Sequence, residues 1–280
     1  MSAAPARARR AWLAALLLAA GCPRVPPPGL PHDAPGLLAA VEAARGKVRR
    51  VEGTARLGLE GQGGGSAEAF VAAERPGRLR IELLDFFGAP AALLVVSGGR
   101  FLHFDARRGT WTRGEATPAS LARLLPLSLP VEEAVALLCG DVPLVNGAAV
   151  DASPGDGVMK LVLAEEGGTG RQQWLGVGAG AAVEWSRIVR LAEGGQVEPA
   201  GPAIRLSALA PRGAVRFPGQ LRVERPPSPA VTLAWRGEPA LDGPARPGAF
   251  SLEPPPGARV LDLPAGAEPG SLHLPLPGGE

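Results

Sequence analysis

Apolar and polar side chains alternate along many short segments of this 280-residue chain, with glycine and proline between the segments. In residues 78–83, for example, Arg, Leu, Arg, Ile, Glu and Leu follow one another. A period of two places successive side chains on opposite faces of a strand, so the pattern predicts strands with one buried face. Gly-rich turns at 61–65 and 98–99 link neighbouring segments, which favours an antiparallel meander.

Two stretches have helical spacing instead. Residues 36–48 carry apolar side chains at helical intervals, and residues 119–139 do so again. Pro126 and Pro130 interrupt the second stretch, so we predict a short helix, a kink and a second helix from Val131 to Cys139. The predicted strands lie at 51–59, 67–73, 78–83, 91–96, 101–105 and near Trp111, and then at 158–164, 172–177, 186–191, 204–209, 220–224 and 231–235. We therefore predict a mainly β fold: an open antiparallel half-barrel of about 10–11 strands, with an N-terminal helix and a helical insert that covers its cavity.

The N-terminus has the three zones of an export signal. Arg7, Arg9 and Arg10 form a basic start, an apolar run follows at 12–20, and small residues lead into Cys22. The apolar run is about nine residues long, whereas a membrane-spanning helix needs roughly 20. We therefore interpret residues 1–21 as a signal peptide that is removed.

The segment Leu18-Ala19-Ala20-Gly21-Cys22 resembles the lipobox of bacterial lipoproteins. The resemblance implies that the Cys22 thiol carries a diacylglycerol, that cleavage precedes Cys22, and that the new amine is acylated. Pro23 follows the cysteine, where an Asp would imply retention at the inner membrane, so the resemblance implies an outer-membrane address facing the periplasm. The alternative is an ordinary secretory signal with a cysteine that lies nearby.

After the signal peptide we expect a Pro-rich tether at 22–35 that contributes nothing to a core, a β-barrel domain at 36–253, and an irregular Pro- and Gly-rich tail at 254–280. The full chain has a net charge of +2, and removal of three arginines leaves about −1, which disfavours a nucleic-acid partner. With Cys22 lipidated, Cys139 has no disulfide partner, and we predict that it is a small buried apolar residue.

The order of these segments resembles the LolA/LolB superfamily over residues 36–235. The most specific stretches are the first helix leading into 51–57, the strand 78–83 followed by Leu84-Asp85-Phe86-Phe87-Gly88, and 124–127 followed by 131–143. Members are open β-barrels closed by a helical lid, and they carry or receive the acyl chains of lipoproteins. The family's early Trp is missing here, where Leu57 and Leu59 stand.

Such a barrel would present a concave apolar surface suited to hydrocarbon. The side chains that we predict to line its cavity or lid are Leu57, Leu59, Leu79, Ile81, Leu83, Leu121, Leu124, Leu125, Val135 and Leu138. The alternative is that the same residues form a filled core, and residue types alone favour the filled core for most of them.

Phe86 and Phe87 stand together in the turn between two predicted strands. Successive side chains alternate between faces, so both rings cannot enter one core face and at least one is expected to be exposed. The resemblance implies that this is a loop that inserts into a membrane. The alternative is that both rings pack under a neighbouring strand.

Signs of enzymatic chemistry are weak. The chain has three histidines, at 32, 103 and 273, without metal-ligand spacing, and we expect His103 to be a surface residue. The run Gly176-Val177-Gly178-Ala179-Gly180 lacks the spacing of a dinucleotide-binding loop and indicates a turn. We predict no enzymatic activity, no cofactor and no metal.

The function that these features favour is that of an outer-membrane lipoprotein which binds acyl chains, as a receptor or chaperone in lipoprotein localisation. Its expected partners are lipoprotein acyl chains or another lipid, a periplasmic carrier protein, and the membrane through the lipid anchor. The alternative is a non-enzymatic structural or assembly lipoprotein that binds a protein partner in the envelope.

Overall fold

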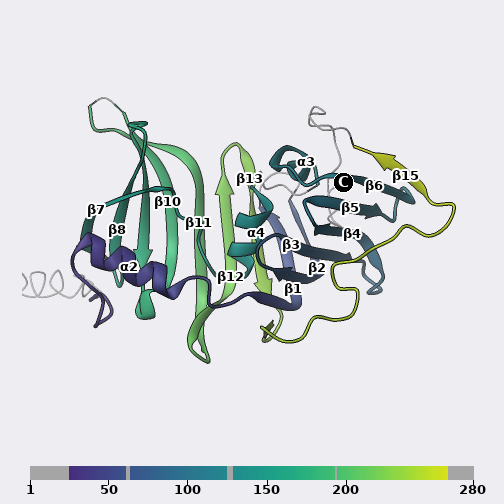
Figure 1. Ribbon diagram of the computed structural model, residues 1–280, viewed down its shortest axis with the longest axis horizontal. Coiled ribbons are helices and arrows are strands. Elements are labelled where there is room, and N and C mark those ends of the chain that lie inside the picture. Colours follow the sequence, from purple (N-terminus) through teal and green to yellow (C-terminus); the bar gives the residue numbers. More distant parts are fainter. Residues whose placement is uncertain (1–24, 61–63, 125–128, 193, 264–280) are drawn as a thin grey trace, which may run out of the picture.

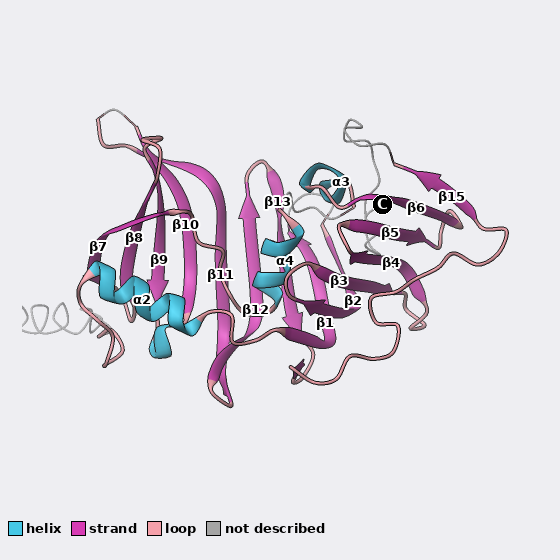
Figure 2. Cartoon of the chain, in the orientation of Figure 1, coloured by secondary structure: helices cyan, strands magenta, loops and turns pink. Residues whose placement is uncertain are grey.

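A computed structural model describes residues 25–60, 64–124, 129–192 and 194–263. In these residues fifteen strands join into a single curved sheet (Figures 1 and 2). Its order is β15-β6-β5-β4-β3-β2-β1-β13-β12-β11-β10-β9-β8-β7, and β14 also pairs with β1. All pairs are antiparallel except β15 with β6. The mainly β, antiparallel architecture is therefore confirmed.

The first half of the sheet is a meander of strands in chain order. Its strands are β1 (Arg50–Glu60), β2 (Gly65–Glu74), β3 (Arg78–Leu84), β4 (Pro90–Ser97), β5 (Arg100–Asp105) and β6 (Thr110–Glu115). The second half is β7 (Gly147–Pro154), β8 (Met159–Glu165), β9 (Arg171–Val177), β10 (Val183–Leu191), β11 (Val197–Arg212), β12 (Val215–Arg225) and β13 (Ser228–Trp235). Because β13 pairs with β1, the two halves form one continuous sheet.

Each half of the sheet has its own hydrophobic cluster and its own helices. The first cluster joins the inward side chains of β1–β4 to α3 (Pro118–Ala122) and α4 (Val131–Leu138). The second cluster joins α2 (Ala34–Ala44) to β8, β9 and the neighbouring strands through Leu37 and Val41. Figure 1 shows α2 lying across the β7–β10 half, with α4 near the middle of the molecule.

The helices begin and end at local signals. Asp33 caps α2 by accepting a hydrogen bond from the Gly36 backbone N–H at 2.7 Å. Gly46, with a φ of +73°, lies just beyond the end of α2. Pro130 precedes α4, and Gly140, with a φ of +87°, follows it and lies against Phe217. The helix predicted at 36–48 is therefore shorter than expected. The short helix and the second helix predicted within 119–139 correspond to α3 and α4.

The predicted count of about 10–11 strands is too low. The β7 strand was not predicted, because its register shifts between Ala149 and Asp151 and most of its side chains are exposed, so it lacks a period of two. The short strands β14 (Ala240–Leu241) and β15 (Arg259–Asp262) add to the count. The segment at 254–280 was expected to be irregular, yet β15 pairs with β6.

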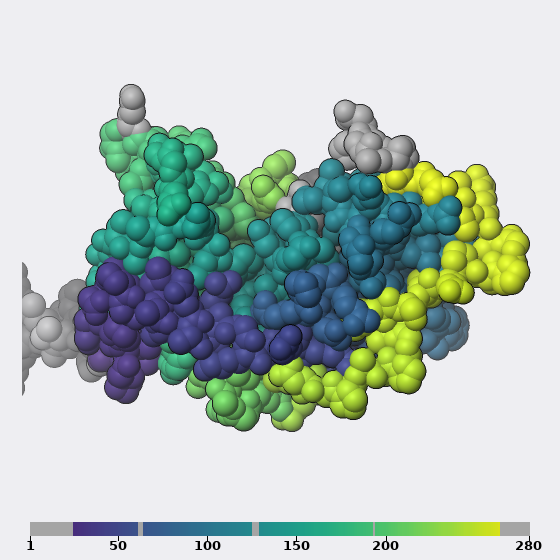
Figure 3. Space-filling view, viewed as in Figure 1, coloured from purple at the N-terminus to yellow at the C-terminus, as the bar shows by residue number. Residues whose placement is uncertain are grey.

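Two further segments differ from expectation. Leu30 of the predicted tether is buried in the second cluster, because the chain before α2 folds back over that cluster. Residues 242–263, which we call the C-terminal strap, pack Ala249 and Phe250 on Ala72 of β2. Since Val71 and Ala73 belong to the first cluster, Ala72 faces the opposite side of the sheet, and the strap therefore covers the outer face. Figure 3 shows the strap running from the lower edge of the molecule, in yellow-green, to its right side, in yellow.

Candidate functional site

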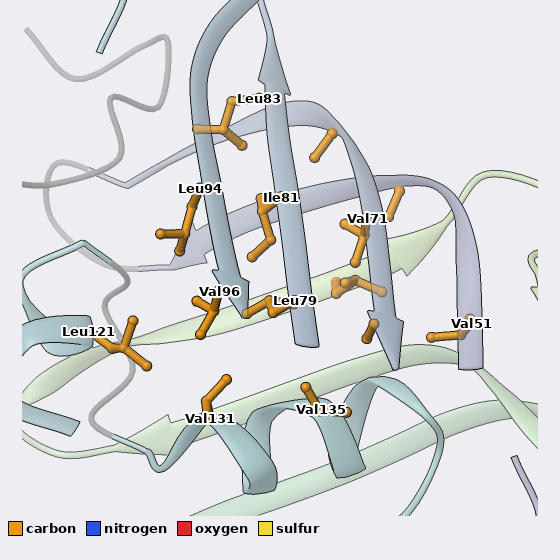
Figure 4. Packing of buried hydrophobic residues seen from close by; sticks show 14 of the residues in the cluster. Val51, Val71, Leu79, Ile81, Leu83, Leu94, Val96, Leu121, Val131 and Val135 are labelled. Carbon is orange, nitrogen blue, oxygen red and sulfur yellow. The ribbon is translucent and has the colours of Figure 1, made fainter. Parts of the chain in front are cut away.

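The inner face of the first half of the sheet is aliphatic and is covered by helices. In Figure 4, Leu79 and Ile81 of β3 lie above Val131 and Val135 of α4, with Leu121 of α3 beside them. These residues are buried, and they contact one another across the interface between sheet and helices. An acyl chain would reach the inner face here only after α3 and α4 had moved away from it.

The side chains predicted to line a cavity largely meet in this first cluster. Buried members are Leu79, Ile81, Leu83, Leu121, Leu124 and Val135, and Leu57 and Leu138 are half-buried against them. Leu59 is half-buried outside this cluster, and Leu125 lies outside the described residues. In this structure the predicted lining and the predicted lid therefore form a packed interface.

The turn between β3 and β4 holds two aromatic rings away from the protein. Its geometry comes from Asp85, whose backbone N–H donates to Ala89 O at 2.8 Å and whose Oδ1 accepts from Phe87 N at 2.9 Å and Ala89 N at 2.8 Å. Gly88 supplies the left-handed residue of the turn, with a φ of +79°. The Phe86 and Phe87 side chains are 96% and 90% exposed, with ring centroids 5.5 Å apart.

The exposure of these rings confirms the prediction that at least one is exposed, and the alternative in which both pack under a strand is wrong. We call Asp85–Ala89 the Phe turn. The turn between β5 and β6 lies beside it, because Ala106 N donates to Ala91 O at 3.1 Å. That neighbouring turn carries the exposed side chains of Arg107 and Arg108. Apolar and cationic groups therefore share one end of the sheet.

His103 was expected on the surface, but its side chain is only 1% exposed. The inward-facing residues of β5 are Phe101, His103 and Asp105. His103 is two residues from the buried Phe101 and therefore lies on the same face of the strand. Neither ring nitrogen of His103 has a hydrogen-bond partner among the described residues. Burial lowers the pKa of His103 to about 4, an effect opposed by Asp105.

Cys139 is buried, as predicted, and burial raises the pKa of its thiol to about 12. At neutral pH it therefore remains a thiol and is a poor nucleophile. In the part of the chain that the structure describes, no three His, Cys, Asp or Glu side chains come together as a metal site. Cys22 lies outside the described residues. No described helix has the length and apolar character needed to cross a membrane.

The sequence did not point to a cavity of about 190 Å³ between the ends of α2 and α4. Its lining includes Arg45, Lys47, Asp141 and Arg216, which come from three distant parts of the chain. No single motif joins these residues, so spacing could not have identified them. The nearest signal was two basic residues, Arg45 and Lys47, near the end of the helix predicted at 36–48.

The sequence matches no protein-family model and no curated protein. Solved structures are similar in fold. An outer membrane lipoprotein-sorting protein domain from Vibrio parahaemolyticus has a TM-score of 0.50 at 7% identity, over 77% of this chain and 94% of that one. A DUF1329 family protein from Desulfovibrio piger has a TM-score of 0.51 at 12% identity, with the same coverage. A LolA superfamily protein from Nitrosomonas europaea has a TM-score of 0.46 at 10% identity, over 76% and 94%.

Proposed function

We propose that this chain binds acyl chains as a receptor or chaperone for lipoproteins at the outer membrane, because its fold is similar to that of an outer membrane lipoprotein-sorting domain. The observation that carries the proposal is the Phe turn, which presents two exposed rings at one end of a sheet with an aliphatic inner face. We assign the two Phe rings to contact with the membrane lipid. We assign the inner face to the acyl chains that pass between the protein and that membrane.

The exposure of the Phe86 and Phe87 rings to water is energetically unfavourable. An exposed Phe side chain is less favourable than a buried one by about 1.5–3 kcal/mol. The hydrogen bonds to Asp85 Oδ1 fix the turn, so the rings project without packing on the protein. Insertion of both rings into the acyl region of a membrane would recover this free energy. Arg107 and Arg108, on the neighbouring turn, would then lie near lipid phosphates.

The inner face can exchange one apolar partner for another. Leu121, Val131 and Val135 cover it with the same kind of hydrocarbon that an acyl chain presents. Each methylene group of a chain that displaced α3 and α4 would contribute about 0.8 kcal/mol on burial, which would offset the loss of the apolar contacts that the helices make. We therefore assign α3 and α4 as a lid that packs on the sheet when no acyl chain is bound.

The Phe turn is tested with the double variant Phe86→Glu/Phe87→Glu. We expect transfer of an acylated lipoprotein to vesicles to fall at least tenfold, while the free energy of unfolding stays nearly unchanged because both rings are exposed. The matched control is Leu191→Glu/Val197→Glu, which changes two exposed apolar side chains on the other half of the sheet. If the Phe variant transfers lipoprotein as well as wild type does, the membrane role of the turn is wrong.

The cargo is tested on a Cys22→Ser form, which removes the acyl chains that the proposal places on the protein itself. Organic extraction followed by mass spectrometry should recover bound acyl chains from this form. Absence of acyl chains, combined with capture of a protein partner that depends on Phe86 and Phe87, would favour the envelope-assembly role instead.

The anchor is a separate part of the proposal. We expect Cys22→Ser to leave an uncleaved or soluble protein, since without acyl chains nothing holds the tether on the membrane. Membrane fractionation and intact mass measure the two effects. Wild-type partitioning of the Cys22→Ser form with outer membranes would show that the anchor lies elsewhere.

A further inference from the structure

The cavity between the ends of α2 and α4 joins parts of the molecule that are far apart in sequence. Its walls are the α2–β1 link at 44–48, the end of α4 at 139–142, the segment 180–183, and the β11–β12 hairpin at 211–217. In Figure 1 these elements meet near the centre of the molecule, between one end of α2 and the β11–β12 hairpin.

The charges around this cavity are mostly positive. Arg45, Lys47 and Arg216 line it, and Arg75 approaches Asp141 from the β2–β3 turn. Asp141 is the carboxylate of the lining, and it is already engaged. Its Oδ2 accepts hydrogen bonds from Gly46 N, at 2.8 Å, and from Arg75 Nη2. Arg216 Nη2 donates to Leu209 O at 3.0 Å. The cationic side chains of the lining therefore outnumber its carboxylates.

Arg45 has a donor that the protein leaves unused. Its Nε is enclosed and has no hydrogen-bond partner in the described residues. Burial lowers the pKa of Arg45, and Asp141 opposes that effect. A buried donor without an acceptor costs about 1–3 kcal/mol. An oxygen anion in the cavity would offset the positive charge of Arg45, Lys47 and Arg216.

The cavity also lies at the seam between the two hydrophobic clusters. Val48, Cys139 and Phe217 on its wall belong to the first cluster, and Val142 and Val183 belong to the second. A group bound among the cations would therefore have apolar side chains of both clusters next to it. This combination suits an anion that continues into a hydrocarbon chain.

We propose that this cavity binds a phosphate group, either free or at the head of a single-chain lipid. The inference deepens the proposed function, because it gives the acyl ligand a charged head group and a defined site for that group. The part of the inference that concerns a lipid rests on the proposed function. Phosphate suits the cavity because it presents several acceptor oxygens and up to two charges, which match the convergent Arg and Lys donors.

Isothermal titration of the lipid-extracted, full-length mature protein tests the site with three probes: dodecyl phosphate, dodecanol and inorganic phosphate. We expect dodecyl phosphate to bind at least tenfold more tightly than dodecanol. Arg45→Gln and Lys47→Gln should each weaken dodecyl phosphate several-fold and leave dodecanol unchanged. Arg49→Gln is the matched control, because it removes one positive charge from a nearby exposed residue outside the cavity lining.

The outcomes separate the two proposals. Equal binding of dodecyl phosphate and dodecanol would overturn the phosphate site and leave acyl binding intact. If inorganic phosphate binds in an Arg45-dependent manner and as tightly as dodecyl phosphate, the cavity is a site for free phosphate, and the lipid part of the proposal is wrong. Binding of none of the probes would overturn both. Should Arg45→Gln unfold the protein, the exposed Lys47→Gln variant still decides the matter.

Discussion

At the scale of single residues, protonation of the buried His103 opposes folding. It lies on the inner face between Leu94 of β4 and Thr112 of β6, and its neighbouring charges are Asp105 and Arg108. Its pKa is lowered to about 4 from an ordinary value of 6.5. Between these two pH values the unfolded chain binds a proton that the folded protein excludes, so stability rises with pH across this window.

We therefore predict that His103 lowers the free energy of unfolding by about 2 kcal/mol at pH 5 compared with pH 7.5. Replacing it with Leu should remove this contribution, because Leu has a similar size and does not titrate. Urea unfolding of wild type and His103→Leu at the two pH values measures the effect. If the free energies of unfolding of wild type and His103→Leu differ by the same amount at pH 5 and pH 7.5, the prediction is wrong.

At the scale of elements, Asp141 connects three segments at the end of α4. Its carboxylate accepts from Gly46 in the α2–β1 link and from Arg75 in the β2–β3 turn. Desolvation raises the pKa of Asp141, and the hydrogen bond from Gly46 and the charge of Arg75 oppose this shift. The end of the proposed lid is therefore tied to both the first helix and the sheet.

Asp141→Ala should destabilise the protein by about 2 kcal/mol, because it leaves the Gly46 donor and a partly buried Arg75 without their acceptor. Urea unfolding gives the loss of stability, and hydrogen exchange should show the greatest acceleration in α4. Asp262→Ala is the control: it breaks the exposed ion pair with Arg113 and should change stability little. Similar effects of the two variants would contradict the special role of Asp141.

The elements that could be predicted from sequence are those with one face in a hydrophobic cluster. In β3, Leu79, Ile81 and Leu83 are buried while the alternate side chains are not, so the pattern shows in the sequence. In β7 a register shift and the exposure of most side chains remove that pattern. The short strand β15 forms through its pairing with β6, which its own sequence does not indicate. The Phe turn could be found because it is local. The cavity at Asp141 depends on tertiary contacts that no local pattern records.

At the scale of the whole molecule, one continuous sheet connects two hydrophobic clusters. Leu221 of β12 packs against both clusters, so the halves share side-chain contacts as well as backbone hydrogen bonds. The C-terminal strap lies on the outer face of the first half and links strands within it. It contacts β1 through the Arg246–Glu52 ion pair, β2 through Phe70 and Ala72, and β6 through β15.

Phe250 is the main apolar contact of this strap. Its ring is buried against Ala72, the Arg78 guanidinium lies 4.5 Å from its centroid, and Arg80 Nη1 donates to Ala249 O at 3.2 Å. Phe250→Ala removes the ring from between these groups and should destabilise the protein by about 2 kcal/mol. We expect the strap to detach locally, because the first cluster and α4 lie on the other face of the sheet.

Hydrogen exchange tests this expectation strand by strand. In Phe250→Ala, exchange should accelerate in β15 and in the edge of β6 that it covers, while α4 and the second half of the sheet keep their wild-type rates. Leu261→Ala is the control, since it shortens a more exposed apolar side chain on β15 and leaves the Phe250 contacts in place. Equal acceleration throughout the sheet would show instead that the strap is part of one cooperative unit with the first cluster.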